Sequence, residues 1–176
     1  ASKDKNEPLF VLLHGAGVMG SDNLKQLFDN IPLYKRLLKT DCNILLPQAP
    51  FGSNRGEAMQ NYIKSIKKLT DELPADFDRK RIYIIGTSFG GCCVWQLIYL
   101  FPEYFAAAVP VMGGLCPDRD YEKYDIERLV KTPIWTAHSS DDTNVKINSD
   151  DYYAAELKKL GADIKYTRWD KYGHTM

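Results

Sequence analysis

The sequence predicts an α/β fold of three layers, in which helices cover both faces of a mostly parallel sheet of about six strands. Three observations support this prediction. Short apolar runs typical of buried strands alternate along the chain with segments of helical spacing. The 176 residues, of which 44% are hydrophobic and 26% charged, are enough to form one domain with a sizeable core. No repeat, low-complexity stretch or linker divides the chain.

The individual elements follow from the positions of apolar residues and helix breakers. Apolar runs of about five residues predict strands, and apolar residues three or four positions apart predict helices. Proline lacks the N–H that a helix interior uses, and glycine readily ends a helix. In chain order we expect strand Leu9–His14, helix Leu24–Leu38 interrupted near Pro32, strand Asn43–Pro47, helix Glu57–Leu73, strand Arg81–Gly86, helix Gly91–Phe101 ended by Pro102, strand Ala106–Val111, strand Ile134–His138, helix Tyr152–Leu160 ended by Gly161, and strand Ile164–Trp169.

Charge and hydropathy argue against several classes of protein. Lys and Arg together number 23, as do Asp and Glu, so we expect no nucleic-acid partner bound through a basic patch. The apolar runs are far shorter than the roughly 18 residues of a membrane-spanning helix, so we expect no membrane partner. The chain begins ASKDKNEP, without the apolar stretch of a signal peptide. Two locations stay open: the cytoplasm, or a secreted domain whose signal has been removed.

The four cysteines do not predict a metal site. They are Cys42, Cys92, Cys93 and Cys116, and they form no C-x-x-C pair. No histidine lies at zinc-ligand spacing from them. We therefore expect free, partly buried thiols and no bound metal.

The strongest motif is GTSFG, residues Gly86 to Gly90, which matches the nucleophile elbow G-x-S-x-G. Such a serine lies on a strained turn between a strand and a helix, and a side chain two residues to either side would clash there. An expected strand precedes the motif and an expected helix follows it. This context favours Ser88 as a nucleophile over the alternative, a glycine-rich turn with an incidental serine.

A serine nucleophile needs a general base, and the chain offers three histidines. His14 follows the first expected strand, His138 ends the fifth, and His174 lies in the segment KYGHTM after the sixth. In hydrolases with this kind of serine turn the chain order is serine, acid, histidine. Only His174 follows a plausible acid, so we predict it as the base. We expect His138 to be a structural hydrogen-bonding residue.

The orienting acid is expected just after the fifth strand, where the chain reads HSSDDTNV. A common pattern there is H-G-x-x-D-x-x-V, which places the acid four residues after the histidine and a valine three residues further on. That register selects Asp142, with Val145 in place. Asp141 stays open as the alternative acid. If Asp142 is the acid, we expect Asp141 to be a turn residue that binds the backbone of its own loop.

Two backbone amides are candidates for an oxyanion hole. One is the N–H of Phe89, directly after the serine. The other is the N–H of Ala16, in the loop HGAG after the first strand, which Gly15 and Gly17 would shape. With Gly20 these glycines also spell G-x-G-x-x-G, the dinucleotide fingerprint. That alternative is disfavoured, because Pro-Gln-Ala follows the second strand where an acidic ribose ligand would be needed.

With these residues assigned, the chain resembles the α/β-hydrolase superfamily. Within it, the chain is similar to small esterases often described as predicted peptidases, related to the phospholipase/carboxylesterase and polyhydroxyalkanoate-depolymerase-like groups. The similar segments are LLHGAG, GSDN, LLPQAP, IYIIGTSFGG, FPEYFAAAVPVMGG, TPIWTAHSSDD and KYGHTM. The resemblance implies a minimal α/β-hydrolase fold and an ester hydrolase with Ser88 as nucleophile, Asp142 as acid and His174 as base, without metal or organic cofactor.

The resemblance carries two further expectations. Gln48 and Trp95 are expected near or under the site in a supporting role. Such relatives have strands before the one expected at Leu9 and a helix after the catalytic histidine. Residues 1–176 are therefore expected to be a single domain that lacks both.

The expected substrate is a small-molecule or polysaccharide-linked ester. Residues expected to contact it are Gly15, Gly17, Gln48, Gly114 and Tyr121, the last two in the long stretch 112–132 after the fourth strand. A small open site favours short acyl esters. Alternatives are an acetyl or feruloyl ester of plant polysaccharide, or an amide cleaved by the same three residues. A non-catalytic binding domain that retains the fold is the alternative of another class.

Overall fold

The computed structural model describes residues 6–29, 31–74, 77–115 and 123–174. Its centre is one sheet of six parallel strands in the order β2–β1–β3–β4–β5–β6. The strands are β1 (Leu9–Leu13), β2 (Asn43–Leu45), β3 (Ile82–Thr87), β4 (Ala107–Val111), β5 (Ile134–Ser139) and β6 (Ile164–Trp169). The predicted fold class is confirmed, and the strand ends differ from the expected ones by at most two residues.

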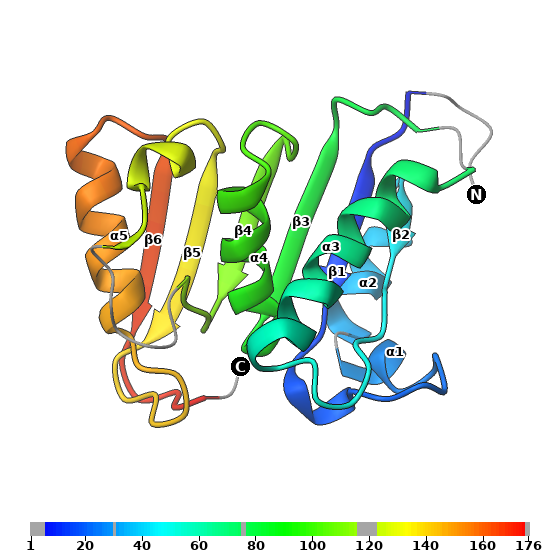
Figure 1. Ribbon diagram of the computed structural model, residues 1–176, viewed down its shortest axis with the longest axis horizontal. Coiled ribbons are helices and arrows are strands. Elements are labelled where there is room, and N and C mark those ends of the chain that lie inside the picture. Colours follow the sequence, from blue (N-terminus) through cyan, green and yellow to red (C-terminus); the bar gives the residue numbers. More distant parts are fainter. Residues whose placement is uncertain (1–5, 30, 75–76, 116–122, 175–176) are drawn as a thin grey trace.

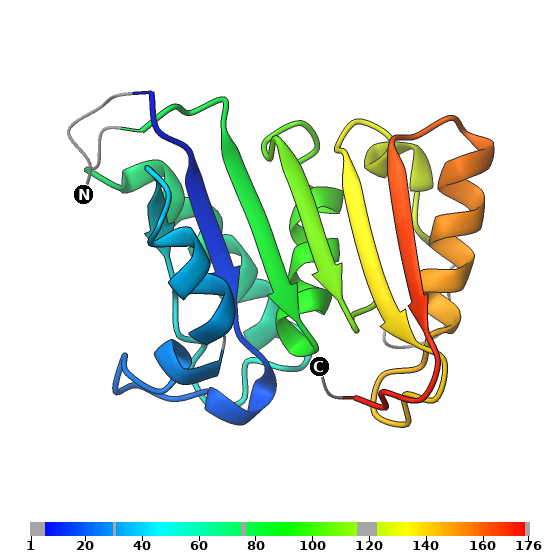
Figure 2. The same cartoon turned by 180° about the vertical axis from the view of Figure 1, so that it is seen from behind.

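Helices lie on both sides of this sheet. They are α1 (Gln26–Asp29), α2 (Ile31–Leu37), α3 (Gly56–Glu72), α4 (Phe89–Leu100) and α5 (Asn148–Lys159), with 3₁₀ turns η1 (Ala16–Val18) and η3 (Ile126–Leu129). Figure 1 shows α3, α4 and α5 on one face of the sheet. Figure 2 shows α2 on the opposite face, beside β1 and β2.

Two of the expected helices differ from those observed, one because it is divided and the other in its length. The segment expected as one interrupted helix forms α1 and α2, and Pro32 lies in the first turn of α2, where a missing N–H leaves no helical acceptor unpaired. Helix α5 begins at Asn148, four residues before the expected Tyr152. Its first turn is polar and therefore shows no apolar periodicity, but acidic side chains at Asp150 and Asp151 suit a helix N-terminus.

Helix α4 lies at the centre of the core and fixes the position of the serine turn. Its residues Cys93, Val94, Trp95, Leu97 and Ile98 are all fully buried. They pack with apolar side chains of the strands and of α3, among them Leu13, Ile63 and Ile84. A helix buried this completely holds its first residue in a fixed place against the sheet.

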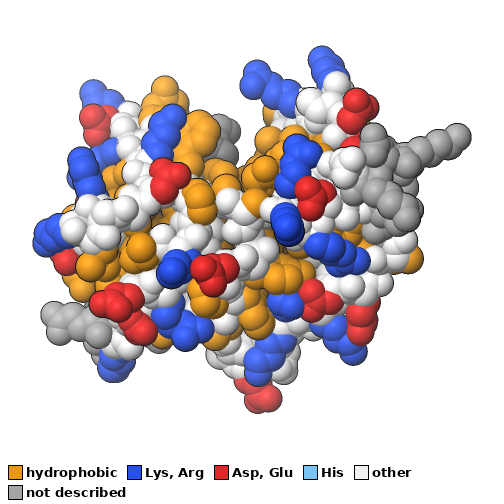
Figure 3. Space-filling model, turned by 90° about the horizontal axis from the view of Figure 1, so that it is seen from above, with side chains coloured by type: hydrophobic (Ala, Val, Ile, Leu, Met, Phe, Trp, Pro, Cys, Tyr) orange, Lys and Arg blue, Asp and Glu red, His pale blue; other side chains and the backbone are white. Residues whose placement is uncertain are grey.

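Because all six strands are parallel, the loops that follow them meet at one edge of the sheet. This carboxyl edge is the lower one in Figure 1. Figure 3 shows the opposite edge from above, where basic and acidic side chains are interspersed among apolar ones. Within the described ranges, no helix combines the length and apolarity needed to cross a membrane.

Candidate active site

Ser88 lies in the tight turn between β3 and α4 and has an unusual backbone conformation, with φ 56° and ψ −120°. A Cβ atom added at Gly86 would collide with the Gly90 backbone, and one added at Gly90 would collide with the backbone of Leu13. No residue with a side chain therefore fits at either glycine of the motif. The Ser88 N–H donates to the Val111 carbonyl at 2.8 Å, which ties the turn to the end of β4.

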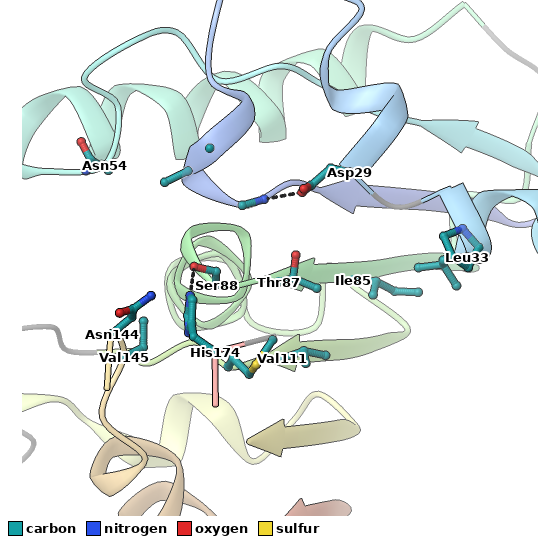
Figure 4. Close-up of a pocket in the computed structure, with 15 residues that line it drawn as sticks. Asp29, Leu33, Asn54, Ile85, Thr87, Ser88, Val111, Asn144, Val145 and His174 are labelled. Carbon is teal, nitrogen blue, oxygen red and sulfur yellow. Dashed lines mark hydrogen bonds between the residues drawn. The ribbon is translucent and has the colours of Figure 1, made fainter. Parts of the chain in front are cut away.

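Ser88, His174 and Asp142 form a continuous series of hydrogen bonds. The Ser88 hydroxyl donates to His174 Nε2 at 2.7 Å, and His174 Nδ1 donates to Asp142 Oδ2 at 2.7 Å. Figure 4 shows the imidazole of His174 pointing at Ser88. The partners on each side assign the tautomer, with the proton on Nδ1 and a free lone pair on Nε2. The three residues come from three loops at the carboxyl edge.

Asp142 is buried and has four donors. Its Oδ1 accepts from the amides of Asn144, at 2.8 Å, and Val145, at 3.0 Å. Its Oδ2 accepts from His174 and, at 3.2 Å, from Nε2 of His138. Burial alone would raise the pKa of Asp142, but the bond with His174 and the two amides outweigh it, so the pKa lies below its ordinary value. Asp142 is therefore a carboxylate at neutral pH.

The neighbouring Asp141 does not contact His174 and binds the histidine loop instead. Its Oδ1 accepts from the Ser139 hydroxyl at 2.6 Å and from the Gly173 amide at 2.8 Å. The Tyr172 amide donates to the same serine oxygen at 3.1 Å. The structure thus brings Asp142, rather than the alternative Asp141, to the imidazole and uses Asp141 to hold the loop that carries it.

The glycine loop after β1 lies against the serine turn. A Cβ added at Gly15 would lie 3.8 Å from Cβ of Ser88, and the Gly15 amide donates to Asp29 at 2.8 Å. Among the described residues, no acceptor takes a hydrogen bond from the amide of Ala16 or of Phe89. Two unpaired N–H groups beside a serine hydroxyl can stabilise negative charge that develops on a carbonyl oxygen.

Side chains behind the glycine loop hold it in place. His14 accepts from the Ala49 amide at Nε2, at 2.8 Å. Gln48 donates to the Val18 carbonyl at 3.0 Å and accepts from the Asn23 amide at 2.7 Å. Gln48 thus joins two points of the loop, and it does not line the cavity described next.

A cavity of about 1080 Å³ opens above Ser88 and His174. Figure 4 shows apolar side chains on one side of it, such as Leu33 and Ile85, and the amides of Asn54 and Asn144 on the other. The full lining is Gly15, Ala16, Gly17, Asp29, Pro32, Leu33, Asn54, Ile85, Thr87, Ser88, Val111, Met112, Asn144, Val145 and His174.

The expected substrate residues are only partly found at this cavity. Gly15 and Gly17 line it. Gly114 does not; it packs against Ser149, 3.1 Å from the position of an added Cβ. Tyr121 and Cys116 lie outside the described residues. The sequence analysis missed the cavity residues on α1, α2 and the loop before α3. Thr87 and Asn144, which it also missed, lie within two positions of the predicted residues Ser88 and Asp142.

The cysteine and metal expectations concern residues away from this cavity. Cys42, Cys92 and Cys93 are free thiols. Burial raises the pKa of Cys92 to about 11, so it is protonated at neutral pH. Over the described ranges, no group of three or more His, Cys, Asp or Glu side chains is arranged to hold a metal ion.

Known proteins that are similar to this chain include hydrolases and esterases. Residues 49–176 match the dienelactone hydrolase family. The fold superimposes on the crystal structure of a thermostable esterase with a TM-score of 0.79 and 34% identity, over 98% of this chain and 48% of that one. Carboxylesterase SOBER1 of Arabidopsis thaliana is 22% identical over 95% of this chain and 83% of its own.

A third relative is much longer than this chain. Poly(3-hydroxyalkanoate) depolymerase C of Paucimonas lemoignei is 26% identical over 62% of this chain and 28% of its own length. This chain therefore spans less than half of the depolymerase and of the thermostable esterase.

Proposed function

Because the chain belongs to the dienelactone hydrolase family, with esterases among its relatives, we propose that it is a serine-dependent carboxylic ester hydrolase that acts on short acyl esters. The hydrolase and esterase character follows from the family, and the predicted resemblance is confirmed at that level. The observation that carries the finer proposal is the hydrogen-bonded series Ser88–His174–Asp142 at the floor of a cavity.

The proposed reaction proceeds through an acyl-enzyme. His174 Nε2 accepts the Ser88 proton as Oγ attacks the ester carbonyl, and Asp142 stabilises the imidazolium that forms. The amides of Ala16 and Phe89 donate to the oxyanion. The imidazolium then protonates the departing alcohol, and water attacks the acyl-enzyme by the same route.

The cavity lining supports a small acyl group joined to a polar alcohol. Leu33, Ile85 and Val111 offer an apolar wall for a short acyl chain. Asp29, Asn54 and Asn144 offer polar groups that can bind hydroxyls of the alcohol. Those polar groups are the reason to keep acetyl or feruloyl esters of polysaccharide as a second candidate substrate class.

The decisive experiment is Ser88→Ala with a fluorophosphonate probe and a series of p-nitrophenyl esters of increasing acyl length. We expect stoichiometric labelling of the wild type, and a loss of ester turnover in the variant of roughly 10⁴-fold or more. Ser65→Ala is the matched control, because Ser65 is an exposed serine of α3. It should be labelled and active like the wild type.

Other outcomes would separate the alternatives. Near wild-type turnover in Ser88→Ala would contradict the assignment of the nucleophile. Efficient cleavage of matched amides beside that of the esters would favour a peptidase or amidase. Absence of both labelling and turnover in the wild type would favour a binding domain that retains the fold.

A further inference from the structure

The triad acid has a second histidine behind it. His138, at the end of β5, and Asp150, in the first turn of α5, are both fully buried. His138 Nδ1 lies 2.7 Å from Asp150 Oδ2, and His138 Nε2 lies 3.2 Å from Asp142 Oδ2. The hydrogen-bonded series at the site therefore continues from Ser88 and His174 through Asp142 to His138 and Asp150.

Every partner of the His138 ring is an acceptor. Nε2 also lies 2.9 Å from the Val145 carbonyl, which cannot donate, so this nitrogen carries a proton. Nδ1 faces a carboxylate whose other oxygen already accepts from the Trp95 indole at 2.9 Å. A lone pair at Nδ1 would face the lone pairs of that carboxylate. The contacts are satisfied when both ring nitrogens are protonated.

The ionisable groups around the pair act in both directions. Burial raises the pKa of Asp150, and the bonds from His138 and Trp95 act against that rise, so the assignment turns on the shared proton lying on His138 and not on Asp150. Burial lowers the pKa of His138, but the bond and the charge of Asp150 outweigh it, and the pKa lies above its ordinary value. Burial raises the pKa of Tyr166 on β6 and of Cys92 on α4, so both are neutral. Arg168 on β6 is paired with Asp151 of α5 at 3.3 Å.

We propose that His138 is a buried imidazolium, clamped between Asp150 and Asp142, and that it acts as a positioning residue for the triad. It donates to the same oxygen of Asp142 that His174 uses, and its charge draws electron density from that oxygen. The bond between Asp142 and a protonated His174 is thereby weakened. A weaker bond to Asp142 favours the neutral imidazole of His174, which is the form that acts as a base.

The test is Asp150→Asn, a change of nearly equal shape that keeps an oxygen for the Trp95 indole. The new amide donates to Nδ1, so His138 becomes neutral while Nε2 still donates. The proposal rests on the proposed function, in which the acidic limb of the kcat/KM profile reports protonation of His174. We expect that limb to move up by about 0.5 to 1 pH unit, because the cation beside Asp142 is lost.

The sign of this shift distinguishes the proposal from a simple charge effect. Loss of a carboxylate that acts only through space would move the limb to lower pH, because a negative charge near His174 is removed. Asp151→Asn is the matched control for that effect, since Asp151 is the next residue and binds Tyr166 and Arg168 instead. We expect no upward shift there. A downward or unchanged limb in Asp150→Asn would overturn the proposal.

A second measurement does not depend on turnover. The chain has three histidines, so ¹⁵N-histidine labelling gives three sets of ring signals, which His174→Gln helps to assign. At pH 7 the wild type should show His138 with protons on both nitrogens, and a neutral His138 would overturn the proposal. If ester turnover were instead found to be independent of Ser88, the proposed function would fail while this spectrum still decided the state of His138.

Discussion

Two adjacent carboxylates at the end of β5 differ in what each one binds. Asp142 is buried and accepts from His174, whereas Asp141 is exposed and accepts from the Ser139 hydroxyl and the Gly173 amide. One side chain orients the imidazole, and the other fixes the loop on which the imidazole lies. In the proposed reaction an orienting charge has no substitute, whereas the loop has several supports.

We therefore expect Asp142→Asn to lower kcat/KM by on the order of 10²-fold more than Asp141→Asn, because an amide cannot stabilise the imidazolium. Steady-state kinetics on one short ester will measure both variants against the wild type. Equal losses would mean that the loop contacts of Asp141 matter as much as the orientation of His174, and a reversed order would move the acid to Asp141.

At the scale of elements, the serine turn depends on close contact between β1 and α4. An added Cβ at Gly90 would meet the backbone carbonyls of Leu13 and His14, and backbone cannot turn aside as a side chain can. We expect Gly90→Ala to lower the free energy of unfolding by about 3 kcal/mol. Urea unfolding followed by fluorescence will measure it.

Gly17→Ala is the control for that change. Nothing lies within 4 Å of a Cβ added at Gly17, and its backbone is not in the left-handed region. Its unfolding free energy should therefore stay within about 0.5 kcal/mol of the wild type. A comparable loss of unfolding free energy in both variants would show that the loss comes from replacing a glycine as such and not from contact with β1.

The position of the glycine loop depends on hydrogen bonds from Gln48. Its amide joins the Val18 carbonyl, the Asn23 amide and the Asp22 carboxylate, so one side chain connects three points of the loop. We expect Gln48→Ala to reduce kcat by roughly 10-fold with little change in KM, because a displaced oxyanion donor affects the transition state more than binding. An increase in KM alone would instead indicate that Gln48 contacts the substrate.

At the scale of the whole molecule, the folded protein holds several carboxyl groups in their charged form. Backbone amides of Leu24 and Lys25 lower the pKa of Asp22 from 3.8 to about 2. Asp71, Asp141 and Asp142 also have lowered pKa values, through bonds with Lys67, Ser139 and His174 respectively. Each of these groups binds a proton more readily in the unfolded chain than in the folded one.

The free energy of unfolding should therefore decrease as the pH falls from 5 to about 2, since the stabilisation is present above the unfolded pKa and is lost through the folded one. Urea titrations at several pH values in that range will measure the slope. Asp22→Asn should make the slope shallower. Stability that stayed constant between pH 5 and 2 would contradict these pKa shifts.

The sequence alone determined the features that depend on neighbouring residues. Strands appear as apolar runs because both faces of a parallel sheet are buried, and all six were predicted. The serine turn was predicted because its motif is contiguous in the sequence, and Gly86 is required by the backbone of Gly90, four residues further on. Helix α5 was predicted too short because its first turn is polar, and local periodicity does not register a buried polar residue such as Asp150.

The tertiary structure decided everything that joins distant segments. Whether Asp141 or Asp142 meets His174 depends on contacts across 32 residues of chain, and the cavity wall is formed by α1, α2 and several loops together. In the sequence His138 was predicted as a structural hydrogen-bonding residue, and nothing pointed to Asp150 as its partner. Only the packing of α5 against β5 buries both side chains and brings them within 2.7 Å of each other, so their pairing could be found only in the tertiary structure.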